Sequence, residues 1–315
     1  MTDSTLIHTS STKVGYIVET NYAGGVAGAK YAMTQIANNA ALASINMQKA
    51  DMELGIPEVE RVQIKPATAA PDAKFIFDKG YKYKEFKIEQ YIQSEVWAAQ
   101  IGAAITPGTL HTSYSFHCEI PGVNGVMDYF DIFGCTLIDY EIDQPEDGDF
   151  PTEKLTFSYY DIGDGVAHST LGGFLSTAPS THKDVSLSID AEAIPNLMSA
   201  NLKITLETLD KKVATKYQRF DPQIISRDVN LECKYYSNTT VEKSVLGDEL
   251  AIAGALTAIH EVAVALTYIS TAANLSATKM YVDTSSIGKV PSEMGLYEHS
   301  LTMKTGAANA VAHNT

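Results

Sequence analysis

The chain has 315 residues, of which 45% are hydrophobic and 19% charged, so it can fill a core and is not disordered overall. Its 38 acidic and 23 basic residues give a formal net charge of −15, which argues against a nucleic-acid grip built on clustered Lys and Arg. Cys118, Cys135 and Cys233 are too few and too scattered for a disulfide scaffold. Because the first residues lack the basic and apolar regions of a secretory signal, we expect a globular protein made where thiols stay reduced.

The first 57 residues differ in composition from the rest of the chain. Residues 24–47 are rich in Ala, Gly and Asn and carry few charges. They fit a helix from about Ala27 to Met47, or an extended arm of small residues that lies on a neighbouring molecule. Ala favours a helix and Asn opposes it, so both alternatives stay open.

Beyond this segment, apolar and polar residues alternate with period two in a series of short runs. In the first clear run, Tyr114, Phe116, Cys118 and Ile120 alternate with Ser113, Ser115, His117 and Glu119. Similar runs lie at 155–159, 185–189, 202–206, 229–235 and 262–268, and turn-rich segments lie at 121–125, 143–149 and 161–165. Strands with one polar face belong to antiparallel sheets, so we predict a mainly β fold of the sandwich or barrel kind.

Two segments break this pattern and predict α-helices. Residues 89–104 carry an apolar stripe at helical spacing and the only tryptophan, Trp97, and residues 248–259 form the second segment. Each of them precedes a new strand, so each half of the chain has the order strands, helix, strands. We therefore predict a duplicated β-domain, with copies at 58–166 and 180–305, each with a flanking helix.

An apolar run over 250–273 is long enough to cross a bilayer, but His260 and Glu261 lie at its centre. Ionisable residues at mid-depth are costly. From Val262 onwards the residues alternate in the manner of a strand. We expect the second helix followed by a strand here, and no membrane association.

Motifs for catalysis, cofactors or metals do not stand out, since nucleophile elbows, Walker loops and dinucleotide fingerprints are missing. His111, His117 and Cys118 are candidate zinc ligands, but residues 117 and 118 point to opposite faces of a predicted strand and cannot converge on one ion, so we expect a surface His and a core Cys. The acidic loop 143–149 lacks EF-hand spacing and is interpreted as a solvated turn. Asp128 and Asp131 are expected near strand ends. These observations favour a structural role without enzyme activity, cofactor or metal.

Several short sequence segments follow one another in an order that is typical of one family of viral proteins. They are 13–25 (KVGYIVETNYAGG), the segment 129–160 around an acidic turn, the pair 200–209 and 225–236, and the pair 262–268 and 297–304. Within 129–160 the matching places are held by Gly134, Cys135, Ile138, Tyr140, Phe157 and Tyr159. In this order the chain resembles the major tail tube proteins of long-tailed, siphovirus-like bacteriophages and archaeal tailed viruses.

The resemblance implies a subunit of the hollow viral tail. In that family, β-sandwiches with a flanking helix join edge to edge into rings, and stacked rings form the channel for the genome. Rings usually present six β-domains, so a duplicated chain implies a pseudo-sixfold trimer and a single-domain chain implies a hexamer. The implied partners are further copies, other tail proteins at the tube ends, and viral DNA in transit without specific binding. The implied location is the virion tail, after synthesis in the host cytoplasm, with residues 1–57 and turns such as 143–152 bridging the rings.

An acidic lumen would repel DNA phosphates and let the genome slide. The candidate lumen-facing acids are Glu85, Glu89, Glu95, Asp143, Glu146, Asp147 and Asp149. One rival interpretation is another virion shell or capsid protein, which more often has a long spine helix. A β-sandwich binding module such as an adhesin, which predicts a secretion signal, and a soluble enzyme on a β-barrel are the others.

Overall fold

The computed structural model describes residues 13–19, 43–45, 51–54, 58–64, 75–82, 85–92, 107–108, 112–122, 126–159, 161–165, 179–189, 191–194, 196–213, 216–237, 261–269, 273–289, 297–305 and 311–314. The strands are β1 (Lys13–Val18), β2 (Ala43–Ile45), β3 (Asp51–Leu54), β4 (Glu58–Ile64), β5 (Phe75–Lys82), β6 (Glu85–Tyr91), β7 (Ser113–Pro121), β8 (Met127–Gln144), β9 (Thr152–Ser158), β10 (Asp161–Asp164), β11 (Ser186–Ile189), β12 (Glu192–Ala193), β13 (Leu197–Val213), β14 (Lys216–Ser237), β15 (Val262–Ile269), β16 (Ala273–Lys289), β17 (Tyr297–Thr305) and β18 (Val311–Asn314). A 3-10 turn, η3, covers His182–Asp184, and these described ranges contain no α-helix.

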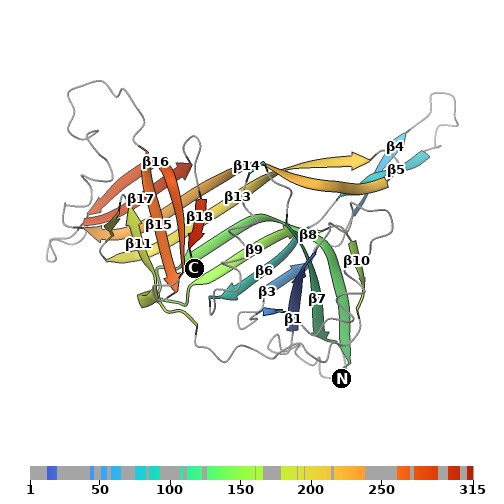
Figure 1. Cartoon of the computed structure of the whole chain (residues 1–315), viewed down its shortest axis with the longest axis horizontal. Coiled ribbons are helices and arrows are strands. Elements are labelled where there is room, and N and C mark those ends of the chain that lie inside the picture. The colour runs from blue at the N-terminus through green and yellow to red at the C-terminus, as the bar shows by residue number, and fades with distance from the viewer. Residues whose placement is uncertain are drawn as a thin grey trace.

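Most of these strands belong to one antiparallel sheet of 16 strands, which confirms the expectation of a mainly β, antiparallel fold (Figure 1). Its main path runs β12-β11-β15-β16-β17-β14-β13-β8-β7-β1-β2, with β9, β6 and β3 continuing from the other edge of β8. The N-terminal and C-terminal halves of the chain meet where β8 pairs with β13. Among the described strands, β4 and β5 pair with each other and form a separate two-stranded sheet, which Figure 1 shows near the ends of β13 and β14.

The long strand β8, which has 18 residues, organises the first half by changing partners along its length. Its first part pairs with β7 and β10, and its second part with β9 and β13. At the change, Gly134 adopts a left-handed φ of 61°, a conformation that glycine tolerates without steric cost. The β7 ladder shifts register between Tyr114 and Phe116 at this point, as expected for a bulge that bends a sheet. The bend lets Phe116 of β7 pack on Phe157 of β9, with ring centroids 4.9 Å apart.

The apolar faces of the strands form one core that includes both halves. The predicted alternation is confirmed at 185–189, 202–206, 229–235 and 262–268, where every second residue is buried, and in β9 over 153–157. Tyr268 of β15 is hydrogen-bonded to Tyr140 of β8, so side chains of the second half reach the core of the first. The sheet therefore has one buried face along β8, β9 and β13, and an opposite face that carries charged residues.

The two predicted helices, unlike the strands, are not confirmed. A helix beginning at Glu89 is wrong, because β6 continues to Tyr91 and pairs with β9 over its whole length. Residues 93–104 and 248–259 lie outside the described residues. The alternative of a helix as far as Met47 is wrong as well, because Ala43–Ile45 is a strand that pairs with β1.

Other parts of the predicted N-terminal arm also belong to the chain's own sheet. Lys13–Val18 pairs with β7, and Asp51–Leu54 pairs with β6, while residues 20–42 lie outside the described part of the chain. Within the described residues, no helix is long and apolar enough to cross a membrane.

Candidate functional site: an acidic face of the large sheet

The outer face of β8 carries a row of carboxylates opposite a buried apolar row. Asp139, Glu141 and Asp143 are partly exposed, whereas Tyr140 and Ile142 between them are buried. This is the period of two that places alternate side chains on opposite faces of a strand. Because β8 is flanked by β9 and β13 here, the row lies inside the sheet rather than at its edge.

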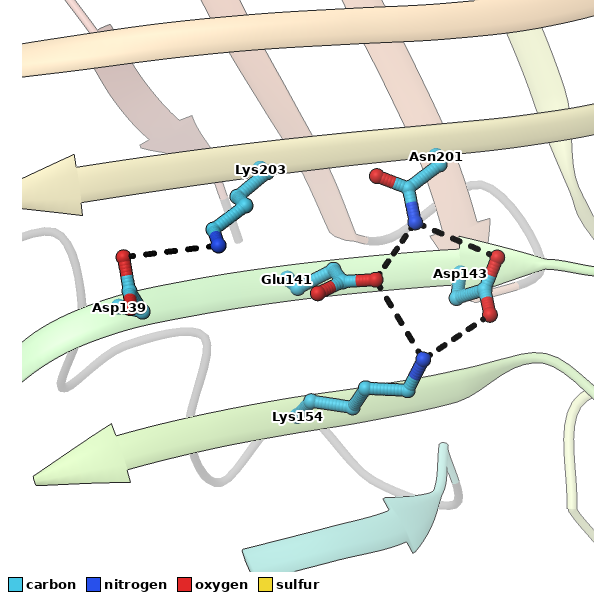
Figure 2. A network of polar contacts seen from close by, with 6 residues as sticks. All are labelled: Asp139, Glu141, Asp143, Lys154, Asn201 and Lys203. Atoms are coloured by element: carbon cyan, nitrogen blue, oxygen red, sulfur yellow. Dashed lines mark hydrogen bonds and ion pairs between the residues drawn. The ribbon is translucent and has the colours of Figure 1, made fainter. Parts of the chain in front are cut away.

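The strand register places cations and an amide beside these carboxylates (Figure 2). Glu141 has Lys154 of β9 opposite it on one side and Lys203 of β13 on the other. Lys154 Nζ donates to Asp143 Oδ2 at 3.1 Å and to Glu141 Oε1 at 3.4 Å. Asn201 Nδ2 donates to the same two side chains, at 2.6 Å to Glu141 Oε1 and 3.4 Å to Asp143 Oδ1.

One further ion pair and one oppositely charged neighbour in register extend this network across the sheet. Lys203 Nζ lies 3.9 Å from Asp139 Oδ1 on the β13 side. On the other side, Glu89 of β6 is opposite Lys154 in the β6–β9 ladder. We call the set Asp139, Glu141, Asp143, Lys154, Asn201 and Lys203, with Glu89, the ion-pair network.

The carboxylates around Lys154 keep it charged. Partial burial by itself lowers the pKa of Lys154, but the hydrogen bond to Asp143 and the charges of Glu141, Asp143 and Glu89 outweigh this, so the pKa is raised. Lys154 is therefore held as a cation between carboxylates of β8 and β6.

The structure brings together only some of the predicted lumen-facing acids. Glu89 and Asp143 meet around Lys154, whereas Glu85 is paired with Lys87 at 3.5 Å, further along β6. Glu95 lies outside the described residues. Sequence reasoning missed Asp139, Glu141 and the two lysines, although the alternation D-Y-E-I-D at 139–143 was a signal for the first two.

The remaining predicted acids, Glu146, Asp147 and Asp149, form an exposed turn between β8 and β9, as expected of a solvated loop. Glu146 Oε2 accepts a hydrogen bond from Lys234 Nζ of β14 at 2.8 Å. The Asp149 N–H donates to Asp147 Oδ1 at 3.3 Å. Gly148, with a φ of 81°, allows the turn to close.

A buried carboxylate lies on the opposite, inner face of the same strands. Glu153 of β9 is 4% exposed and accepts hydrogen bonds from Gln90 Nε2 at 2.5 Å and from the Tyr140 hydroxyl at 3.2 Å. Desolvation raises the pKa of Glu153 to about 7, although these two hydrogen bonds favour the charged form. Sequence reasoning missed this site, because a single Glu in an apolar alternation gives no signal of its own.

A second buried polar group corrects the expectation of a surface His117. Its side chain is buried, and Nδ1 lies 2.6 Å from Asp131 Oδ1 of β8. Glu119 adds a second carboxylate, 3.7 Å from His117 Nε2 and 3.7 Å from Lys13 Nζ. Asp131 is therefore a buried partner within β8, not a residue at a strand end, while the expectation of a core Cys118 is confirmed.

Strand β7 also buries its other polar residues, which contact Glu19, the residue that follows β1. The Glu19 carboxylate accepts hydrogen bonds from Ser113 Oγ at 2.7 Å, Ser115 Oγ at 2.5 Å and the Gly134 N–H at 2.9 Å. Strand β7 is thus buried on both faces, and Glu19 ties it to the bend in β8. These contacts explain why its polar row is not solvent-exposed.

Among the described side chains, no three His, Cys, Asp or Glu residues gather as a metal site. No family model and no curated protein sequence matches the chain.

Proposed function

We propose that the protein is a structural subunit of a viral tail tube, assembling into stacked rings that conduct a genome. The observation that carries the proposal is the continuous antiparallel sheet, which passes from the first half of the chain to the second through β8 and β13 and keeps a charged face along one side. A sheet of this kind is suited to form the wall of a channel, because one face is sealed by the core and the other is available to solvent.

The ion-pair network supports the proposal of a channel wall that does not bind DNA. Asp139, Glu141 and Asp143 place carboxylates along β8, and Lys154 and Lys203 are each held by at least one of them. Phosphate binding requires Lys or Arg side chains that are available to pair with phosphates in place of the cations around DNA. Lysines already engaged by carboxylates are poor at this, and the excess of acid repels a duplex at long range.

The β8–β13 ladder supports edge-to-edge assembly. It joins the two halves by six antiparallel residue pairs, Ala200↔Gln144 to Thr205↔Asp139. In the proposed ring, equivalent pairing between copies continues the sheet around the bore. Under this proposal the chain is a duplicated unit, 58–166 and 180–305, with flanking helices within 93–104 and 248–259, and three copies close a pseudo-sixfold ring.

Negative-stain electron microscopy of the purified chain at rising concentration tests the assembly. Rings or tubes of uniform bore are the expected result, and their averaged views distinguish three copies from six. Closed shells without a bore would instead indicate a capsid-like protein. A folded chain that stays monomeric at high concentration would contradict the proposal.

A cysteine label tests which face lines the bore. Thr205 of β13 is exposed on the charged face, where it lies opposite Asp139 of β8 on one side and Asp228 of β14 on the other. The native Cys118, Cys135 and Cys233 are all buried. The variant Thr205→Cys, labelled with maleimide-gold before assembly, is expected to place gold inside the bore. Wild-type protein carried through the same labelling is the control, and gold on the outer wall would contradict the lumen assignment.

A further inference from the structure

The segment that leads into the second half of the chain is fastened to the end of the first. We define the strap as residues 179–185, which precede β11 and include η3. The Ser180 N–H donates to the Ile92 carbonyl, just beyond β6, at 2.7 Å. A second contact joins the side chains of Gln144, the last residue of β8, and His182 of η3. The strap is therefore held at the ends of β6 and β8.

The position of Pro145 determines which atom of Gln144 is the donor. The Gln144 side chain is buried, and its Nε2 lies 3.0 Å from the Pro145 carbonyl oxygen and 2.6 Å from His182 Nδ1. A carbonyl oxygen can only accept a hydrogen bond, so the amide must turn its nitrogen towards Pro145. The second hydrogen of the same nitrogen is then donated to His182 Nδ1. The contact therefore requires a neutral His182 whose hydrogen is on Nε2.

Protonation of His182 removes the acceptor from this contact. A protonated imidazole carries a hydrogen on both nitrogens, so its Nδ1–H would face the amide hydrogens of Gln144. Turning the amide over does not restore the contact, because Oε1 would then face the Pro145 carbonyl oxygen. Nε2 would take the place of Oε1, which has no hydrogen-bond partner among the described residues. Since histidine ordinarily titrates around pH 6.5, this change belongs to mildly acidic conditions.

The charged groups on either side of His182 are engaged elsewhere. On η3, Lys183 is exposed, and Asp184 accepts two hydrogen bonds from the residue that caps η3, at 2.7 and 2.8 Å. In the turn after β8, Glu146 Oε2 accepts a hydrogen bond from Lys234 Nζ at 2.8 Å. These contacts of the two carboxylates do not depend on the protonation of His182.

The titratable groups of the neighbouring strands are also accounted for. Glu153 of β9 accepts a hydrogen bond from Tyr140 of β8, and Tyr140 is hydrogen-bonded to Tyr268 of β15, the strand that packs on η3. Asp143 and the other acidic residues of the ion-pair network lie on the outer face of the sheet, opposite to Gln144. His182 is thus the group whose titration changes the contact with Gln144 directly.

We propose that Gln144 and His182 form a pH-sensitive latch, which is closed when His182 is neutral and opens when His182 is protonated. Opening releases the strap from the end of β8. Strand β11 stays in place, because Leu187 and Ile189 are buried in the core. The latch concerns a single chain and does not depend on the proposed tail-tube function. It makes the connection between the two halves looser in acidic surroundings.

Hydrogen–deuterium exchange of the full chain tests the latch at about pH 8 and about pH 5, on either side of the ordinary histidine range. The amides to follow are Ser180 and Asp184, which are hydrogen-bonded within the strap or to Ile92. After correction for the intrinsic effect of pH on exchange, we expect these amides to be about tenfold less protected at the lower pH, because a buried hydrogen bond is lost. Protection of β11 is expected to be unchanged. A strap without pH dependence, or an equal loss of protection in β11, would overturn the latch.

The variant His182→Asn separates the latch from other effects of pH. Its Oδ1 can accept from Gln144 and does not titrate, so we expect strap protection close to that of the wild type at pH 8 and the same at both pH values. The control Lys183→Gln removes a neighbouring charge and is expected to respond to pH like the wild type. Because Glu153 titrates in a similar range in all of these proteins, the comparison isolates His182. A wild-type pH response in His182→Asn would overturn the proposal.

The reciprocal variant Gln144→Leu removes the donor and keeps an apolar side chain of similar size at the buried position. We expect its strap to be about tenfold less protected than the wild type at pH 8, and to show no further loss at the lower pH. Wild-type protection of the strap in Gln144→Leu at pH 8 would show that the contact does not hold the strap, and would overturn the latch.

Discussion

Glu153 shows how one residue couples the core to pH. Its carboxyl is surrounded by Gln90 and Tyr140, and Tyr140 in turn contacts Tyr268 of the second half. Burial raises its pKa from an ordinary value of 4.5 to about 7. The folded chain therefore holds this proton over a pH range in which the unfolded chain has released it, so the contribution of Glu153 to stability is complete below pH 4.5 and is lost as the pH rises to about 7.

The variant Glu153→Gln tests this coupling. At about 1.4 kcal/mol per pH unit, the wild type loses roughly 3 kcal/mol of folding free energy between the two pKa values, relative to a neutral side chain of the same shape. We expect Glu153→Gln to be more stable than the wild type at pH 8 by up to this amount, and the difference to vanish near pH 4.5. Urea unfolding at both pH values measures it, with the exposed Glu146→Gln as the control. Equal pH slopes in wild type and Glu153→Gln would contradict a buried, protonated Glu153.

At the scale of elements, the bend in β8 decides how the first half folds. Gly134 provides the left-handed residue at the point where β8 changes partners, and Glu19 holds its N–H. Without the bend, Phe116 and Phe157 could not face each other across the core. A residue with a side chain is strained at this φ by about 1–2 kcal/mol.

The variant Gly134→Ala is therefore expected to be less stable than Gly148→Ala. Both glycines have positive φ, but Gly148 lies in an exposed turn where an added Cβ meets nothing within 4 Å. Gly148→Ala should cost only the backbone strain, whereas Gly134→Ala also adds a methyl group at a buried position. Thermal unfolding followed by circular dichroism compares the two. A loss for Gly134→Ala no larger than that for Gly148→Ala would show that the bend does not depend on glycine.

The elements also show what the sequence could and could not predict. Alternation of apolar and polar residues predicted β9, β11 and β13–β15, because a strand with one core face has that period whatever it pairs with. The burial of His117 could not be predicted, since alternation separates two faces but does not reveal what covers the polar one. Nor could the meeting of Glu89, Lys154 and Glu141, because it depends on the order of β6, β9 and β8 in the sheet. Among the candidate acids, proximity in sequence identified the turn, and only the fold identified the network.

At the scale of the whole molecule, the two halves share one sheet and one core. The β8–β13 ladder joins them along the sheet, and the contact between Tyr140 and Tyr268 joins them through the core. Two independent domains would place the boundary between 166 and 180 in a linker with few contacts across it. The ladder and the buried tyrosines instead predict that neither half unfolds without exposing the apolar surface of the other.

Core truncations in each half test this cooperativity. Phe157→Ala removes a ring from the first half, and Leu266→Ala removes a side chain from the second, and both residues are buried. Each variant is expected to cost roughly 2–5 kcal/mol and to lower one common melting transition by about 5–10 °C. Differential scanning calorimetry measures this, with the exposed Ile225→Ala on β14 as a control that should leave the transition nearly unchanged. Two separate transitions, each moved by only one of the core variants, would mean that the halves unfold independently and that the β8–β13 ladder joins two autonomous domains.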